Sequence, residues 1–371
     1  MSEKGYRSEK GYRVEKDSMG EIKVPVDRHW GAQTQRAIEN FTISGMTMPP
    51  EFLQALGLLK WAVSSANFDL GLLARDKSEA IGNIALKIAQ GHHLEDFPVD
   101  VFQTGSATST NMNINEVIAN LASTKNLEIH PNDDVNMGQS SNDVIPTTIH
   151  IAASIAVRSN LLDELNHLQE TLENKAASLS DIVKTGRTHL MDAMPVTFGQ
   201  ELRAWANQIK AAREQFEETL PKIEQLAIGG TAVGTGVNAH PDLSQKVVAL
   251  LKQKTGIEFQ SAPDLFKAIS SQDVALELSS NTRNLAVSLT KISNDLRWMN
   301  SGPLAGLAEI SLPMLQPGSS IMPGKVNPVI PESVAMAAAQ VIGNDATISL
   351  AAQSGNFQLN TMLPVIAHNL L

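Results

Sequence analysis

Cysteine is absent from the 371-residue chain. A chain without thiols can form no disulfide, no thiol nucleophile and no cysteine-ligated iron–sulfur cluster. Its nine histidines lack the HExxH spacing, or a similar arrangement, that is typical of metal sites. His92 and His93 are adjacent, but neighbours on a helix point about 100° apart, so joint ligation is not expected. We therefore predict a protein without a metal or another cofactor.

Aromatic residues are also scarce, at 4% of a sequence that is 42% hydrophobic. The core must therefore be aliphatic, which favours helices. No window approaches the roughly 18 continuous apolar residues of a membrane span, and the charged N-terminus lacks the apolar stretch of a secretory signal. A net charge of -10 argues against general binding of nucleic acid. We expect a cytoplasmic protein that binds neither nucleic acid nor a membrane.

The first 13 residues contain a short tandem duplication. Residues 2–7 and 8–13 are both SEKGYR, and this repeat is far shorter than the period of a repeat architecture. Two short charged copies at a terminus are typical of a disordered tail, so we expect residues 1–13 to form one. In residues 14–138, short helical patterns alternate with turns that contain Gly and Pro. We expect this part to be an N-terminal domain.

From residue 139 onward the sequence has the pattern of long helices. Leu165, Leu172 and Leu179 recur every seven residues, and similar apolar stripes follow at residues 202–220 and 278–299. The first helix would cover about 39 residues and span roughly 58 Å. Helices of this length usually form an oligomeric bundle. A monomeric coiled coil is the less favoured alternative, because the positions beside the stripes lack a regular charge code.

Residues 139–371 are thus predicted to be a long-helix bundle domain, and the fold class to be mainly all-α. A fourth helix is expected over residues 331–350, with Pro331 in its first turn, and a fifth from about Gln358. The sequence ends at Leu371 inside that fifth apolar pattern, with no capping residue or polar tail. We therefore expect the fifth helix to be truncated.

Four separated segments are rich in Gly, Ser, Thr and Asn and poor in charge, and each is expected to lie directly before a helix. They are residues 104–113 (TGSATSTNMN), 130–143 (HPNDDVNMGQSSND), 186–190 (GRTHL) and 318–328 (GSSIMPGKVNP). Hydroxyl and amide groups at helix N-termini supply neutral donors, and the helix dipole adds positive potential. An acidic chain can bind a dianion in this way without a basic surface. Any one segment alone is more often an ordinary helix cap.

Together these segments resemble one family. HPNDDVNMGQSSND, GRTHL, GGTAVGTGVN (residues 229–238) and GSSIMPGKVNP are similar, in this order, to the segments of class II, iron-free fumarases in the fumarase/aspartase superfamily. The resemblance runs from about Val14 to Leu371. Aspartases share much of it, but have Gln where His189 stands and typically Ala where Gly324 stands. Argininosuccinate and adenylosuccinate lyases share little beyond residues 318–328, which we call the signature loop.

The resemblance implies three catalytic residues. Ser319 would take a proton from C3 of malate, His189 would act on the leaving water, and Glu332 would pair with His189. A carboxylate partner holds an imidazole in one tautomer and raises its basicity. Removal of a proton beside a carboxylate gives that group a second charge in the transition state, so oriented donors should supply most of the catalysis.

The resemblance also implies the residues that bind the substrate. They are Ser106, Ala107, Thr108, Ser140, Ser141, Asn142, Thr188, Ser320, Lys325, Val326 and Asn327. A second dicarboxylate site matches His130, Pro131, Asn132 and Asp133. Lys325 is the only full positive charge in the signature loop, so we expect it to matter greatly. The family usually has Gly where Ala107 stands, and an alanine there would be strained if its φ were positive, with a penalty in substrate affinity.

A homotetramer is implied as well, with the central helices in one bundle and each active site drawn from three subunits. The implied activity is the reversible hydration of fumarate to (S)-malate. The family adds a small C-terminal helical domain, which we expect this chain to lack. Three alternatives are open: an aspartase-like ammonia lyase, a non-catalytic structural relative comparable to the crystallins, and an inactive truncated fragment.

Overall fold

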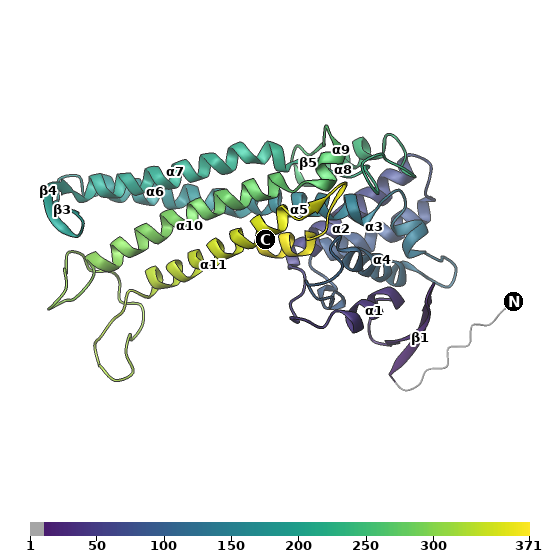
Figure 1. Ribbon diagram of the computed structural model, residues 1–371, viewed down its shortest axis with the longest axis horizontal. Coiled ribbons are helices and arrows are strands. Elements are labelled where there is room, and N and C mark those ends of the chain that lie inside the picture. Colours follow the sequence, from purple (N-terminus) through teal and green to yellow (C-terminus); the bar gives the residue numbers. More distant parts are fainter. Residues whose placement is uncertain (1–10) are drawn as a thin grey trace. The chain divides into compact units, whose positions relative to one another are not determined.

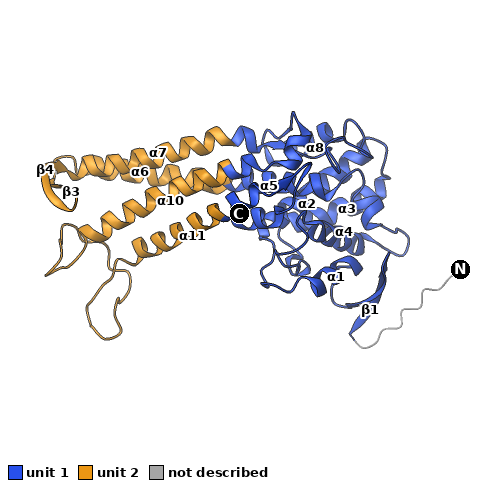
Figure 2. Cartoon of the chain, in the orientation of Figure 1, with its two compact units in different colours: residues 1–156, 220–276, 347–371 blue, residues 157–219, 277–346 orange. Residues whose placement is uncertain are grey.

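The computed structural model describes residues 11–371, and their fold is mainly helical (Figure 1). The strands of this part of the chain form four two-stranded sheets. Two compact units divide the chain (Figure 2): unit 1 holds residues 11–156, 220–276 and 347–371, and unit 2 holds residues 157–219 and 277–346. This division by contacts differs from the domains 14–138 and 139–371 expected from sequence order, which stay a prediction.

Unit 1 begins with an antiparallel hairpin of β1 (Tyr12–Asp17) and β2 (Gly20–Pro25). The expected tail, residues 1–13, lies mostly outside the described residues, but Tyr12 and Arg13 belong to β1 and are not part of a tail. The Arg13 guanidinium donates to the carbonyls of Pro25 at 2.8 Å and Arg28 at 2.6 Å. These bonds explain the ordered hairpin, which local composition could not predict.

The core of unit 1 surrounds α2 (Pro50–Asp69), one of the helices expected within residues 14–138. It packs against α3 (Arg75–Ala89), α5 (Ser141–Ala156) and α8 (Leu243–Thr255). Gly57 allows the close approach of α3, because a Cβ there would lie 2.8 Å from the Ala85 carbonyl oxygen. Around this core lie the remaining short elements: α1 (Ala32–Asn40), a 3₁₀ turn η1 (Leu94–Asp96), α4 (Thr108–Ala122), a π-helical turn η2 (Pro131–Val135), β5 (Gln225–Leu226), β6 (Gln260–Ser261) and α9 (Leu265–Ser270).

The fifth helix begins later than the sequence predicted. Gln358 lies in the turn between β7 (Gly355–Asn356) and β8 (Leu359–Asn360), and α12 covers only Leu363–Leu370. The Asn360 amide donates to the carbonyls of Ala351 at 2.9 Å and Ala352 at 3.1 Å. These side-chain bonds hold a hairpin where the apolar pattern alone predicted helix.

Unit 2 is built from long helices. Its elements are a π-helical turn η3 (Val157–Leu161), α6 (Leu162–Ser178), a hairpin of β3 (Val183–Thr188) and β4 (Met191–Thr197), and its parts of α7 (Phe198–Ile223), α10 (Asp273–Met299) and α11 (Val329–Ala352). The helical segments α5, η3 and α6 follow one another without a break from Ser141 to Ser178, as predicted, but with a π-helical turn inside. The stripes on α7 and α10 are confirmed, because Trp205, Ile209, Phe216, Leu285 and Ile292 are buried.

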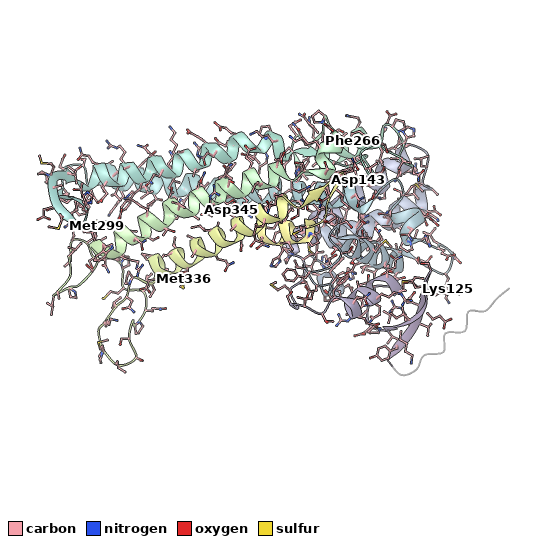
Figure 3. The ribbon with its side chains drawn as sticks, in the orientation of Figure 1. Lys125, Asp143, Phe266, Met299, Met336 and Asp345 are labelled. Carbon is pink, nitrogen blue, oxygen red and sulfur yellow. The ribbon has the colours of Figure 1, made fainter. Side chains whose placement is uncertain are left out.

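A buried polar cluster joins α10 to α11 within unit 2. Asp345 (Figure 3) accepts from the Ser279 hydroxyl at 2.7 Å and from the Arg283 guanidinium at 2.7 Å. Paired in this way, the buried carboxylate fixes the register of the two helices. In residues 11–371, no helix is both long enough and apolar enough to cross a membrane.

Candidate active site

The segment before α4 turns sharply at Ala107. This residue has φ of 54° and is fully buried at the N-cap position of α4, so the condition for a strained alanine is met. Beside it, the hydroxyls of Ser106 and Thr108 lie 2.9 Å apart. Gly105 is required for close approach, because a Cβ there would lie 1.9 Å from the Thr361 carbonyl oxygen. The effect of Ala107 on substrate affinity stays a prediction.

The second polar segment, Ser140–Asn142, starts α5 and is tied to α4. The Asn111 amide donates to the Ser141 hydroxyl at 3.1 Å, and α4 begins at Thr108. The Asn142 amide donates to the Ala232 carbonyl at 2.8 Å, which lies in the GGTAVGTGVN segment. Unit 1 therefore brings three of the family's segments together.

Asp143 (Figure 3) is the fully buried group that holds two of these segments. Its carboxylate accepts from the backbone N–H groups of Ser140 at 2.9 Å, Gly229 at 3.0 Å and Thr231 at 2.8 Å. Burial raises the pKa of Asp143 to about 6, although these three bonds and the positive charge of Lys60 favour the ionised form.

Lys60 is a second fully buried ionisable group, in the middle of the apolar helix α2. Its ammonium donates to the amide oxygens of Asn136 at 3.1 Å and Gln139 at 2.9 Å. Burial lowers the pKa of Lys60 to about 7, and the nearby Asp143 opposes that shift. Lys60 and Asp143 thus hold residues 136–143 in place through buried hydrogen bonds.

The residues expected to form a second dicarboxylate site, His130 to Asp133, lie at the turn that η2 forms. His130, Pro131 and Asn132 line a cavity of about 520 Å³, together with Lys16 and the start of α1. The His130 ring accepts from the Asp133 N–H at 3.1 Å. Glu116, on the cavity wall, already accepts the N–H groups of Gly31, Gln33 and Thr34. The cations that face this cavity are therefore Lys16 and, when protonated, His130.

His189 stands at the tip of the β3–β4 hairpin, and this differs from the prediction that GRTHL lies directly before a helix. The antiparallel strands β3 and β4 flank a two-residue turn, with Thr188 paired to Met191. Both turn residues are left-handed, His189 with φ of 54° and Leu190 with φ of 61°, as a type I′ turn requires. Because such angles cost about 1–2 kcal/mol for an ordinary residue, the exposed His189 ring sits on a strained turn.

A chain of ion pairs anchors this hairpin. Arg187 contacts Glu309 at 3.1 Å, Lys184 contacts Glu309 at 3.2 Å, and Lys184 also contacts Glu201 at 2.6 Å. The Lys184 side chain is only 4% exposed. Burial alone would raise the pKa of Glu309, but Arg187 and Lys184 hold it below its ordinary value. The network fixes the strand that ends in Thr188.

The signature loop folds around Ser319. The Ser319 hydroxyl oxygen accepts from the backbone N–H groups of Ile321 at 3.3 Å and Met322 at 3.0 Å. The Asn327 amide donates to the Gly318 carbonyl at 2.8 Å and closes the loop. Gly324 has φ of 83°, so the alanine typical of aspartases would be strained at this position.

Lys325, Val326, Asn327 and Glu332 line one cavity of about 760 Å³ in unit 2, with Arg297, Trp298 and Asn300 on its other side. Ser319 and Ser320 are not among its lining residues. Within residues 11–371, Lys325 forms no ion pair and no hydrogen bond joins His189 to Glu332. The His189–Glu332 pair was expected between subunits, so it stays a prediction.

Comparison with known proteins identifies the family. A lyase family matches residues 20–343. The class II fumarate hydratase of Xylella fastidiosa strain 9a5c is 57% identical over 356 residues, which are 96% of this chain and 75% of that protein. The chain belongs to the class II fumarate hydratase family. A class II fumarate hydratase of Pseudomonas aeruginosa is 56% identical over 96% of this chain and 78% of its own length.

Solved structures agree with this assignment of the fumarase fold. The class II fumarase of Schistosoma mansoni has a TM-score of 0.94 at 39% identity, and the match covers 97% of this chain and 80% of that one. A fumarate lyase/delta crystallin of Brucella melitensis, solved with cobalt bound, has a TM-score of 0.90 at 43% identity over 96% of this chain and 80% of its own. This fumarase sequence thus spans about three quarters to four fifths of the length of these relatives.

The sequence prediction missed the groups that hold the fumarase segments in place. Asp143 was inside a quoted motif but had no assigned role. The sequence could have pointed to Lys60, because a lysine between Leu59 and Trp61 in a helix of apolar residues is unusual. The partner of Arg187, Glu309, is 122 positions away in the chain, and nothing in the sequence pairs them.

Proposed function

We propose that this chain catalyses the reversible hydration of fumarate to (S)-malate. Membership of the class II fumarate hydratase family supports the reaction. The main structural support for the mechanism is the set of hydrogen-bond donors around Ser319. Two backbone N–H groups, those of Ile321 and Met322, point at its hydroxyl oxygen. Donors of this kind stabilise negative charge on oxygen and lower the pKa of the hydroxyl. They offer a way to activate a serine base that has no adjacent histidine.

In the malate-to-fumarate direction, Ser319 as the alkoxide takes the proton from C3, and the electron pair of that bond moves onto the adjacent carboxylate. The C2–C3 double bond then forms as hydroxide leaves C2. His189 donates the proton that turns this hydroxide into water, and Glu332 holds the imidazole in the required tautomer. The intermediate carries two negative charges on one carboxylate. Lys325 supplies a full positive charge there, beside the Asn327 amide, whose second N–H is free of the bond to Gly318.

The other substrate contacts are proposed to be neutral. Hydroxyl and amide groups of Ser106, Thr108, Ser140, Ser141, Asn142, Thr188 and Ser320 would bind the carboxylates and the C2 hydroxyl, with backbone from Ala107 and Val326. Support comes from the bonds that orient them, such as the one from Asn111 to Ser141. The second dicarboxylate site at His130, Pro131, Asn132 and Asp133 is part of the same proposal. Proton transfer of this kind requires no cofactor.

A homotetramer with active sites shared by three subunits, and a cytoplasmic location, complete the proposal. The exposed surface of α11 supports assembly, since this helix is apolar on nearly all faces. Met336 (Figure 3) is 68% exposed and Ile330 is 57% exposed. A helix that is apolar all round is normally buried, so we propose that other subunits cover it.

The replacement Ser319→Ala tests the proposed base. It should lower kcat by roughly 10³-fold or more and leave the melting temperature within a degree or so, because the loop is largely exposed. Ser178→Ala, at the exposed end of α6, is the matched control and should retain wild-type turnover. If Ser319→Ala kept a tenth of the activity, Ser319 would not be the base.

A further inference from the structure

His29, His93 and Asp96 bring three metal-ligating groups together in unit 1. None of them belongs to the predicted active site, and sequence spacing did not point to them, because His29 and Asp96 are 67 positions apart. Contrary to the metal-free protein predicted from the histidine spacing, we propose that these three residues bind one divalent transition-metal ion of the zinc and cobalt class. The proposal does not depend on the proposed hydration reaction.

The geometry suits such an ion. The Asp96 Oδ2 atom lies 2.7 Å from Nδ1 of His29 and 3.8 Å from Nδ1 of His93, and one donor atom from each residue lies within 4.8 Å of the others. Ligands held at about 2.0–2.1 Å in a tetrahedron stand roughly 3.4 Å apart. Small ring rotations therefore suffice. The His29 and His93 side chains are 41% and 25% exposed, so solvent reaches them and water can take the fourth position.

The donor set selects the class of ion. Two imidazole nitrogens and one carboxylate oxygen suit zinc, cobalt and nickel, whereas calcium and magnesium prefer oxygen ligands alone. The electrostatics point the same way. The Asp96 side chain is only 2% exposed, and among residues 11–371 no lysine or arginine pairs with it. A buried carboxylate needs a positive partner, and a metal ion would supply one.

The surrounding structure holds the ligands in place. The second carboxylate oxygen of Asp96 accepts the backbone N–H of His29 at 3.1 Å, and the Asp96 carbonyl accepts from the Asn113 amide at 2.9 Å. His93 has φ of 64° and precedes η1. This strained angle begins the turn that sets the two rings 5.6 Å apart, edge to face. Strain of this kind is often retained at ligand sites.

Binding would replace the hydrogen bond between the His29 ring and Asp96 by two metal bonds, and the neutral His29 ring would then carry its proton on Nε2. The ion would join the segment before α1 to the segment after α3. We expect it to stabilise unit 1 and to leave the chemistry of turnover unchanged.

Cobalt(II) is the probe, since its visible absorption is strong only in low-coordinate protein sites. The full 371-residue chain, without a histidine tag, is treated with chelator, dialysed and titrated with Co²⁺. We expect one ion per chain, and at least about tenfold weaker binding in His93→Ala and in His29→Gln. His29→Gln keeps a side-chain donor for Asp96, so its circular dichroism spectrum should match that of the wild type. His92→Ala is the control, because His92 is adjacent, exposed and outside the cluster.

Two results would overturn the proposal. The first is a wild-type chain that shows no visible cobalt band at stoichiometric Co²⁺. The second is a band that weakens equally in the His29, His92 and His93 variants. Neither readout uses turnover of fumarate, so a failure here is distinct from a failure of the proposed reaction.

Discussion

Replacing Asp143 with asparagine should loosen two segments of unit 1 together. The carboxylate accepts three backbone N–H bonds, from Ser140 through one oxygen and from Gly229 and Thr231 through the other. An asparagine has one oxygen and one NH₂ group. The more favourable of the two side-chain amide orientations keeps the oxygen as acceptor for the N–H groups of Gly229 and Thr231. The NH₂ group then faces the Ser140 N–H, so that two donors meet.

The expected loss is that of one buried hydrogen bond, about 1–3 kcal/mol in the free energy of unfolding. The larger loss that follows from an unpaired buried charge is not expected at pH 8, because burial already lowers the pKa of the nearby Lys60 to about 7. Burial also raises the pKa of the Asp143 carboxylate to about 6, so the replacement removes a charge that is costly to bury. At roughly 2–4 °C per kcal/mol, a loss of this size should lower the melting temperature by roughly 2–12 °C. The KM for fumarate should rise several-fold, because Ser140 loses its anchor, while kcat should change less.

Thermal unfolding at pH 8 and steady-state kinetics with fumarate measure both effects. Asp69→Asn makes the same chemical change at the exposed end of α2 and should match the wild type. If Asp143→Asn melted with this control and kept the wild-type KM, the three hydrogen bonds would not be holding the substrate segments, and the reasoning would be refuted.

Three further perturbations have defined outcomes. His189→Asn should lower kcat by about 10²-fold or more without changing the circular dichroism spectrum, since the ring is exposed; a normal kcat would remove His189 from the mechanism. Burial lowers the pKa of His150 from 6.5 to about 4. Between pH 6.5 and about pH 4, His150 is protonated in the unfolded chain but not in the folded chain. The free energy of unfolding therefore falls as the pH drops through this range. Melting curves at pH 7 and pH 4 should show a smaller loss for His150→Gln, and an equal loss would contradict the assignment. Exhaustive chelation should lower the melting temperature but not kcat, and activity that is lost and then restored by divalent ions would contradict metal-free turnover.

Apolar periodicity predicted the long helices well, because these helices are stabilised mainly by burying one apolar face, and that face appears in the sequence as a repeat. Trp205 and Phe216 on α7 and Leu285 on α10 are buried where the stripes predicted. The start of α12 was predicted too early for a physical reason. The pattern at Gln358 is compatible with a helix, but Asn360 bonds back to the end of α11 and stabilises a hairpin. Such contacts depend on the folded chain and leave no periodic signal.

The candidate site was predictable only through its motifs. The motifs at residues 318–328 and 186–190 pointed to Ser319 and His189, but they did not predict which contacts hold either side chain in place. A type I′ turn usually has Asn or Gly at its two central positions, and His189 and Leu190 occupy them here with left-handed angles. Residue types therefore did not predict this turn. The N–H groups that face Ser319 belong to the backbone of Ile321 and Met322, and backbone donors are invisible in a sequence. The cluster of His29 with Asp96 depends on tertiary contact in the same way.

The most direct test of the central claim is the product formed from fumarate in deuterated water, with and without ammonium. We expect (S)-malate with one deuteron at C3 and the same rate in both conditions, because water adds at C2 and the proton returned through Ser319 comes from solvent. Aspartate formed only with ammonium, or no turnover by a folded chain, would contradict the assignment of this chain as a fumarate hydratase.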